Sequence, residues 1–197
     1  MRRYFISITL VTATFLLLPG AISCHAEDFK PDSGFTSLIN GKDLTGWRYQ
    51  PDEKFDGKTD ASDGRYTARD GMIVVNDFNP AKGPHLRQLY TTADFPQNFI
   101  LKLEFRAAPN ADSGIFIRKP QLQCRDYLTA GPYKELKSYK PQDWNLIEIT
   151  VKDGVARCTC NGEVLEAALM LPATGPIGLE ADRGQMEYRR IQLKTLP

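Results

Sequence analysis

The chain has 197 residues, of which 25% are charged, and its formal net charge at pH 7 is +1. This length suits one domain with a substantial hydrophobic core. The near balance of charges excludes an electrostatic case for nucleic-acid binding, so no nucleic-acid partner is predicted.

The first 26 residues are predicted to be a secretory signal peptide. Two arginines begin the segment, an apolar run follows over residues 4–18, and small residues precede Ala26. The run is shorter than the roughly 20 apolar residues of a membrane-spanning helix, so we expect no membrane span. Cleavage after Ala26 predicts a secreted or periplasmic protein with a single domain over residues 27–197. Cleavage before Cys24 is the alternative, and it would make Cys24 the lipid attachment site of a lipoprotein.

Three cysteines follow the predicted signal peptide, and export favours disulfides. Cys158 and Cys160 have the same parity in one predicted strand, so they would lie too far apart to bridge each other comfortably. We therefore expect Cys124 to lie near one of them in an adjacent strand, and any disulfide to join Cys124 to that partner. A metal site built from the three thiolates would lack a fourth ligand.

From residue 35 onward, short strand-like runs alternate with tight turns. Asp-Gly or Asn-Gly pairs stand between strand-like runs at residues 70–71, 153–154 and 161–162, and such pairs are strong hairpin signals. No segment between the runs is long and helix-periodic. We therefore predict an all-β domain, an antiparallel β-sandwich of the jelly-roll type.

Five acidic residues lie between residues 50 and 64, in a stretch with few apolar side chains. This composition predicts an exposed, solvated loop. Carboxylates suit calcium, but their spacing here does not fit the EF-hand pattern. A divalent metal is therefore unsupported by ligand spacing, and no cofactor is predicted.

The stretch from residue 101 to residue 118 contains two strand-like runs joined by a short polar loop. In both runs apolar residues alternate with other residues, which is the period of a strand with one buried face. The residues that we expect in the core are Leu101, Leu103, Phe105, Ile115 and Ile117.

The polar positions of this stretch form the first candidate site. If the two runs pair as a hairpin, Glu104, Arg106 and Arg118 share one sheet surface. We expect that surface to be a concavity that also contains Gln123 and Asp126. The alternative interpretation is a solvated sheet face with charge pairs.

Several kinds of catalytic chemistry are excluded. The sequence has no Gly-x-Ser-x-Gly motif, no phosphate-binding glycine loop and no His-Glu-x-x-His motif. A Ser-His-Asp triad or a poly-histidine metal centre would have only His85 to draw on, and we interpret His85 as a loop residue without a functional role. The remaining carboxylate, guanidinium, amide and aromatic groups are those that carbohydrate sites employ.

Several motifs resemble, in the same order, those of the 3-keto-disaccharide hydrolase domain family. They lie at residues 35–47, 103–106, 112–118, 144–145, 161–162, 175–179 and 187–191. The resemblance spans about residues 35–196, and the ordered set is more specific than any single motif. It implies a concanavalin A-like jelly-roll sandwich with a concave face that receives a sugar.

The resemblance also implies an enzyme that cleaves 3-keto-glycosides, including 3-keto-disaccharides, by elimination followed by hydration. A ketone at C3 acidifies the C2 hydrogen, so the reaction needs a base and stabilisation of the enolate. We expect Glu104 or Glu180 to be the base. Arg106 and Arg118 are expected to stabilise the enolate. The expected substrate-binding residues, which orient hydroxyls or stack on the sugar, are Gln121, Gln123, Asp126, Tyr127, Trp144 and Asn145.

Two positions depart from the family pattern. Gln121 stands where a carboxylate is expected, and Glu180 stands where a glutamine is expected, so one acid has moved. The missing acid favours an alternative function, a non-catalytic carbohydrate-binding module of the bacterial cell envelope. A retaining or inverting glycosidase is a further alternative; it needs two facing carboxylates, and Glu104 with Glu180 is the only pair that we nominate. No positive feature supports a purely structural domain.

Overall fold

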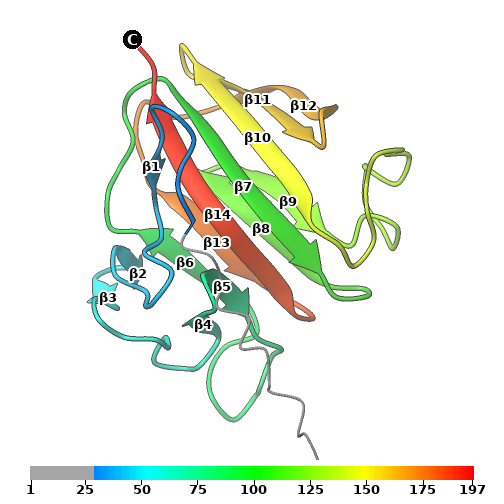
Figure 1. Ribbon diagram of the computed structural model, residues 1–197. Coiled ribbons are helices and arrows are strands. Elements are labelled where there is room, and N and C mark those ends of the chain that lie inside the picture. The colour runs from blue at the N-terminus through cyan, green and yellow to red at the C-terminus, as the bar shows by residue number, and fades with distance from the viewer. Residues whose placement is uncertain (1–28) are drawn as a thin grey trace, which may run out of the picture.

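The computed structural model describes residues 29–197, which form two antiparallel β-sheets packed face to face (Figure 1). The predicted signal peptide and the alternative lipid site at Cys24 lie outside the described residues. Residues 29–197 contain no α-helix, and so this part of the chain has no helix long and apolar enough to cross a membrane. The predicted all-β antiparallel sandwich is confirmed.

The first sheet, sheet A, has the strand order β12-β11-β10-β7-β14-β5-β4, and β1 also pairs with β14. Its strands are β1 (Thr36–Ser37), β4 (Tyr66–Arg69), β5 (Met72–Val75), β7 (Phe99–Ala107), β10 (Asn145–Lys152), β11 (Val155–Cys160), β12 (Glu163–Met170) and β14 (Met186–Thr195).

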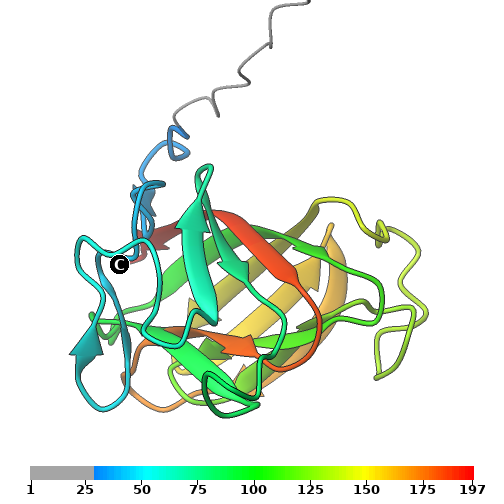
Figure 2. The ribbon, with the colours of Figure 1, turned by 90° about the horizontal axis from the view of Figure 1, so that it is seen from below.

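The second sheet, sheet B, has the strand order β3-β2-β6-β13-β8-β9. Its strands are β2 (Trp47–Tyr49), β3 (Glu53–Lys54), β6 (Arg87–Thr91), β8 (Asp112–Ile117), β9 (Gln121–Arg125) and β13 (Ile177–Ala181). The two layers are also visible from below in Figure 2.

The three predicted hairpin turns join β4 to β5, β10 to β11 and β11 to β12. Both residues of each Asp-Gly or Asn-Gly pair have a positive φ, between 48° and 87°. Asparagine, aspartate and glycine tolerate this backbone region better than other residues, which is why these pairs mark the turns.

The core lies between the sheets and is built by alternation along the strands. In β7 every second residue, from Phe99 to Ala107, is buried, and the residues between them are partly exposed. The five predicted core residues of the 101–117 stretch are all fully buried. Burying one such large apolar side chain contributes roughly 1.5–3 kcal/mol, so alternation decides which face of each strand points inward.

β7 and β8 follow each other in the chain but do not pair. β7 pairs with β10 and β14 in sheet A, whereas β8 pairs with β9 and β13 in sheet B. The predicted hairpin is therefore wrong, because alternation determines the buried face of a strand but not its partner. Both apolar faces point into one core from opposite sides, so Glu104 and Arg106 point away from the outward residues of β8.

Arg118 directly follows β8 and is buried, with 6% of its surface exposed. Its guanidinium donates hydrogen bonds to three backbone carbonyls, those of Phe95 (2.8 Å), Gln97 (2.7 Å) and Pro172 (2.9 Å). Arg118 therefore ties two loops to the end of sheet B. It does not share a surface with Glu104, contrary to the prediction.

Replacing Arg118 with alanine is expected to lower the free energy of unfolding by about 3 kcal/mol. Three carbonyls would lose their donor, and each buried unsatisfied group costs roughly 1 kcal/mol or more. Chemical denaturation measures the change. Lys119→Ala, at the adjacent exposed residue, serves as the control and should change stability by less than about 0.5 kcal/mol. A loss under about 1 kcal/mol in Arg118→Ala would mean that the guanidinium is only a surface charge.

The three cysteines of the described chain are free and buried. Cys124 belongs to β9 of sheet B, whereas Cys158 and Cys160 belong to β11 of sheet A. The predicted placement of Cys124 in a strand adjacent to Cys158 and Cys160 is wrong, because the strands lie in opposite sheets. Burial raises the pKa of Cys158 and of Cys160 to about 12, so these thiols stay protonated and pack as core residues.

Candidate functional site

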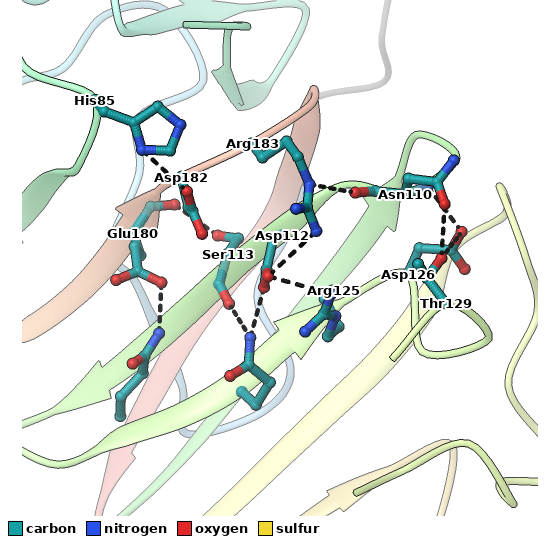
Figure 3. A network of polar contacts seen from close by, with 12 residues as sticks. His85, Asn110, Asp112, Ser113, Arg125, Asp126, Thr129, Glu180, Asp182 and Arg183 are labelled. Carbon is teal, nitrogen blue, oxygen red and sulfur yellow. Dashed lines mark hydrogen bonds and ion pairs between the residues drawn. The ribbon is translucent and has the colours of Figure 1, made fainter. Parts of the chain in front are cut away.

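The outer face of sheet B brings together polar side chains from three neighbouring strands (Figure 3). Gln121 on β9 donates a hydrogen bond from Nε2 to Oε2 of Glu180 on β13, at 2.5 Å. β8 lies between these strands, so the carboxamide has to cross it. It crosses above Gly114, where a Cβ atom would stand 2.0 Å from Nε2 of Gln121. A glycine at position 114 is therefore what lets Gln121 reach Glu180.

Glu180 is the carboxylate of this face that has no cationic partner. It is 9% exposed, and no ion pair within residues 29–197 includes it. Burial raises the pKa of Glu180 above its usual value, and the charges of Asp182 and Asp112 add to the rise; the hydrogen bond from Gln121 opposes it. A carboxylate with a raised pKa is a stronger base than a solvated one.

Asp112 on β8 is held by a different set of contacts. Its carboxylate accepts a hydrogen bond from Nε2 of Gln123 at 2.6 Å and lies 3.2 Å from Nη2 of Arg125. Nη2 of Arg183 lies 3.6 Å from the same carboxylate. Two guanidinium groups therefore balance the charge of Asp112, and these contacts fix the positions of Gln123, Arg125 and Arg183 around it.

His85 belongs to the loop between β5 and β6 and lies beside Asp182, the residue that follows β13. Its Nδ1 lies 3.3 Å from Oδ1 of Asp182, and its side chain is 52% exposed. The buried Arg65 fixes the backbone here, because its guanidinium donates to the carbonyls of His85 (3.1 Å) and Asp182. The imidazole therefore stands beside the acid two residues along the chain from Glu180, although the sequence analysis assigned it no role (Figure 3).

Metal-ligand clusters are absent from the part of the chain that the structure describes: no group of three or more His, Cys, Asp or Glu side chains there is arranged to hold an ion. The groups that the outer face of sheet B itself offers to a ligand are carboxylate, carboxamide, imidazole and guanidinium.

Glu104 lies on the opposite side of the molecule, on the outer face of sheet A. It accepts hydrogen bonds from Arg189 at 2.6 Å and from Arg190 at 3.0 Å. Both oxygens of its carboxylate are therefore already engaged by guanidinium groups. Because Glu104 and Glu180 point outward from different sheets, they cannot face each other across one substrate. The glycosidase hypothesis built on this pair is therefore wrong.

Arg106 and Trp144 lie with Glu104 on sheet A. Arg106 forms an ion pair with Glu187 at 2.6 Å. The guanidinium carbons of Arg106 and Arg189 lie 4.7 Å and 3.7 Å from the centre of the Trp144 ring. The structure therefore separates Arg106 and Trp144 from Glu180, so they cannot act with it on one bound sugar.

Three further predicted residues help to hold the long loop 126–144 between β9 and β10. Tyr127 is fully buried and donates its hydroxyl to a backbone carbonyl, so it cannot stack on a sugar as predicted. Asn145 is fully buried, and its carboxamide bonds backbone groups of the loop. Asp126 is also buried and accepts a hydrogen bond from a backbone N–H group at 3.0 Å. The predicted concavity that joined Asp126 to Glu104 is not formed.

Of the predicted site residues, the structure brings together Glu180, Gln121 and Gln123. The outward residues of this face that the sequence analysis missed are Asp112, Arg125, Asp182 and Arg183. Two of them could have been predicted from the alternation of side chains along a strand. Asp112 alternates with the buried Ser113 and Ile115 of β8, and Asp182 is two residues beyond Glu180, so it has the same parity in the chain.

Replacing Asp182 with asparagine is expected to lower the pKa of Glu180, because the change removes a negative charge that favours the protonated acid. Titration of the glutamate side-chain carboxyl carbons by NMR measures the shift. Asp153→Asn, in the distant turn between β10 and β11, removes an equal charge and should leave the midpoint unchanged. Equal midpoints in the wild type and Asp182→Asn would contradict this account of the site.

Comparison with known proteins finds a matching family model and structures of similar fold. A family model described as the 3-keto-alpha-glucoside-1,2-lyase-like domain matches residues 34–194. A search of curated proteins found no match.

Two crystal structures of candidate glycosyl hydrolases from Parabacteroides distasonis ATCC 8503 resemble the chain. The first has 19% sequence identity and a TM-score of 0.62, over 83% of this chain and 95% of that chain. The second has 16% identity and a TM-score of 0.60, over 82% and 99% respectively. At these identities the likeness concerns the fold, and it agrees with the predicted jelly-roll sandwich.

Proposed function

The chain belongs to the 3-keto-alpha-glucoside-1,2-lyase-like domain family, and from that premise we propose that it cleaves 3-keto-glycosides by elimination and hydration, with Glu180 as the general base. The observation that carries this proposal is the environment of Glu180. It is a largely buried carboxylate with a raised pKa, oriented by Gln121 and without a cationic partner among the described residues. The proposal includes export, which the sequence of residues 1–26 predicts.

The reaction begins at the acidified C2 hydrogen. The ionised Glu180 takes that proton and becomes a neutral acid, and the C–H electron pair forms the enolate of the C3 ketone. The enolate then expels the glycosidic oxygen from C1, and the departing group takes up a proton. Water adds to C1 of the resulting enone and a proton returns to C2, so the net result is hydrolysis.

Glu180 suits the role of base better than Glu104, the other candidate. Both carboxylate oxygens of Glu104 are paired with guanidinium groups, whereas Glu180 has no cationic partner among residues 29–197. Burial and the neighbouring acids raise the pKa of Glu180. Proton abstraction at neutral pH favours a carboxylate with a raised pKa.

Enolate stabilisation needs groups other than the predicted Arg106 and Arg118, since neither faces Glu180. His85 and Arg183 are the partly exposed donors of this face. Nδ1 of His85 lies 3.3 Å from Oδ1 of Asp182. In its imidazolium form His85 carries a proton on each ring nitrogen, so Nε2 can donate to a substrate oxygen while Nδ1 faces Asp182. We assign the enolate oxygen to these two side chains.

Replacing Glu180 with glutamine is expected to lower kcat by about 10²–10⁴-fold, the usual contribution of a general base. The substrates are 3-keto-trehalose and 3-keto-lactose, with and without divalent metal, and the unoxidised parent sugars should not be cleaved. The free energy of unfolding at pH 7 should not fall, because the substitution removes a carboxylate whose ionised form burial disfavours.

Glu104→Gln is the matched control on sheet A and should keep kcat close to the wild-type value. Activity that survives Glu180→Gln and disappears in Glu104→Gln would contradict the assignment. Tight sugar binding without turnover of any 3-keto substrate would instead support the carbohydrate-binding module.

A further inference from the structure

Two aromatic side chains lie side by side on the outer face of sheet B, next to the Glu180 cluster. Tyr90 on β6 and Phe116 on β8 are the cross-strand partners of Gly178 on β13, which lies between them. The ring centroids are 5.7 Å apart and the ring planes are inclined by 48°. Both side chains are half-buried, so the aromatic pair presents part of its surface to solvent.

Gly178 provides the space that this arrangement needs. A Cβ atom at this position would lie 2.6 Å from two ring carbons of Tyr90 and 3.2 Å from Cβ of Phe116. Gly178 is not among the residues with a positive φ, so its backbone does not require glycine. The absent side chain instead lets the Tyr90 ring lie against the backbone of β13.

Polar residues stand at both ends of the aromatic pair. In the strand register, Arg48 lies opposite Tyr90 and Gln121 lies opposite Phe116. A strip with an apolar centre and polar ends matches a pyranose ring, which has an apolar C–H face and hydroxyls around its rim. The chemistry of the strip therefore favours a sugar ring over a wholly apolar ligand.

The strip is continuous with the proposed catalytic group. Glu180 is two residues from Gly178 on the same face of β13, a spacing of roughly 6.6 Å along a strand. Glu180 must approach the face of the 3-keto ring, because the C2 hydrogen of a glucopyranose is axial. When the 3-keto ring lies over Glu180, the second sugar ring of a disaccharide would lie over the aromatic pair.

We propose that Tyr90 and Phe116 form a stacking subsite for the leaving-group pyranose of the substrate. The inference rests on the proposed function, since it takes Glu180 as the base. It makes the preferred substrates 3-keto-disaccharides rather than 3-keto-glycosides with a small leaving group, and it makes Tyr90 a determinant of that specificity.

Kinetics with two kinds of substrate test this subsite. Tyr90→Ala should raise KM for 3-keto-trehalose and 3-keto-lactose by about 5- to 10-fold, as expected for the loss of one stacking contact. It should leave KM for methyl 3-keto-glucoside within about 2-fold, because that substrate has no second ring. Tyr90→Phe keeps the ring and should behave as the wild type. Equal KM changes for both kinds of substrate would overturn the proposal.

Binding of the unoxidised disaccharides, which cannot react, separates the subsite from the catalytic proposal. NMR titration with trehalose and lactose should show weaker binding by Tyr90→Ala and by Gly178→Ala, in which the added methyl group displaces the Tyr90 ring. Unfolding midpoints show that both variants are folded. Tyr90-dependent binding with no turnover by the wild type would refute the proposed function and leave the subsite intact. Wild-type binding that is absent, or that is unaffected in folded Tyr90→Ala, would refute the subsite.

Discussion

The packing of two sheets around one core is the constraint on which the rest of the structure depends. Each strand gains its stability by burying one face, so its polar face has to point outward from its own sheet. Outward-facing polar side chains of strands in different sheets therefore point away from each other. This is why Glu104 on β7 and Glu180 on β13 end on opposite sides of the molecule, and why a site that uses Glu180 cannot include Glu104.

Within sheet B, two glycines determine how the outward side chains meet. Gly114 lets Gln121 cross β8 to reach Glu180, and Gly178 lets the Tyr90 ring lie across β13. From the resemblance to the family we expect an acid at position 121 and an amide at position 180, whereas this chain has Gln121 and Glu180. These two side chains are hydrogen-bonded to each other. The face therefore carries a carboxylate beside Gln121, and the amide at position 121 alone does not argue for a binding module.

Sequence alternation and the Asp-Gly and Asn-Gly pairs were sufficient to predict the sandwich, its turns and the inward residues such as Leu103 and Ile115. Burial of one strand face and the conformation of a tight turn are both local properties. It could not predict that β7 and β8 enter different sheets, since strand pairing depends on contacts between distant segments. The same limit explains the errors at Arg118, Tyr127 and the cysteines. Their partners are backbone carbonyls and core residues from other parts of the chain. Glu180 and Gln121 were predicted because they are the positions where the sequence departs from the family pattern. His85 was missed because side chains in a loop do not alternate between two faces, so the sequence does not show where they point.

Incorporation of deuterium at C2 of the product tests the central claim, that cleavage begins with removal of the C2 proton, most directly. The wild type acting on 3-keto-trehalose in D2O should release 3-keto-glucose that carries deuterium at C2 from the first turnovers, because hydration of the enone takes that atom from solvent. Incubation of authentic 3-keto-glucose without enzyme measures background exchange. Cleavage that leaves the original hydrogen at C2 would show direct hydrolysis and would contradict the account.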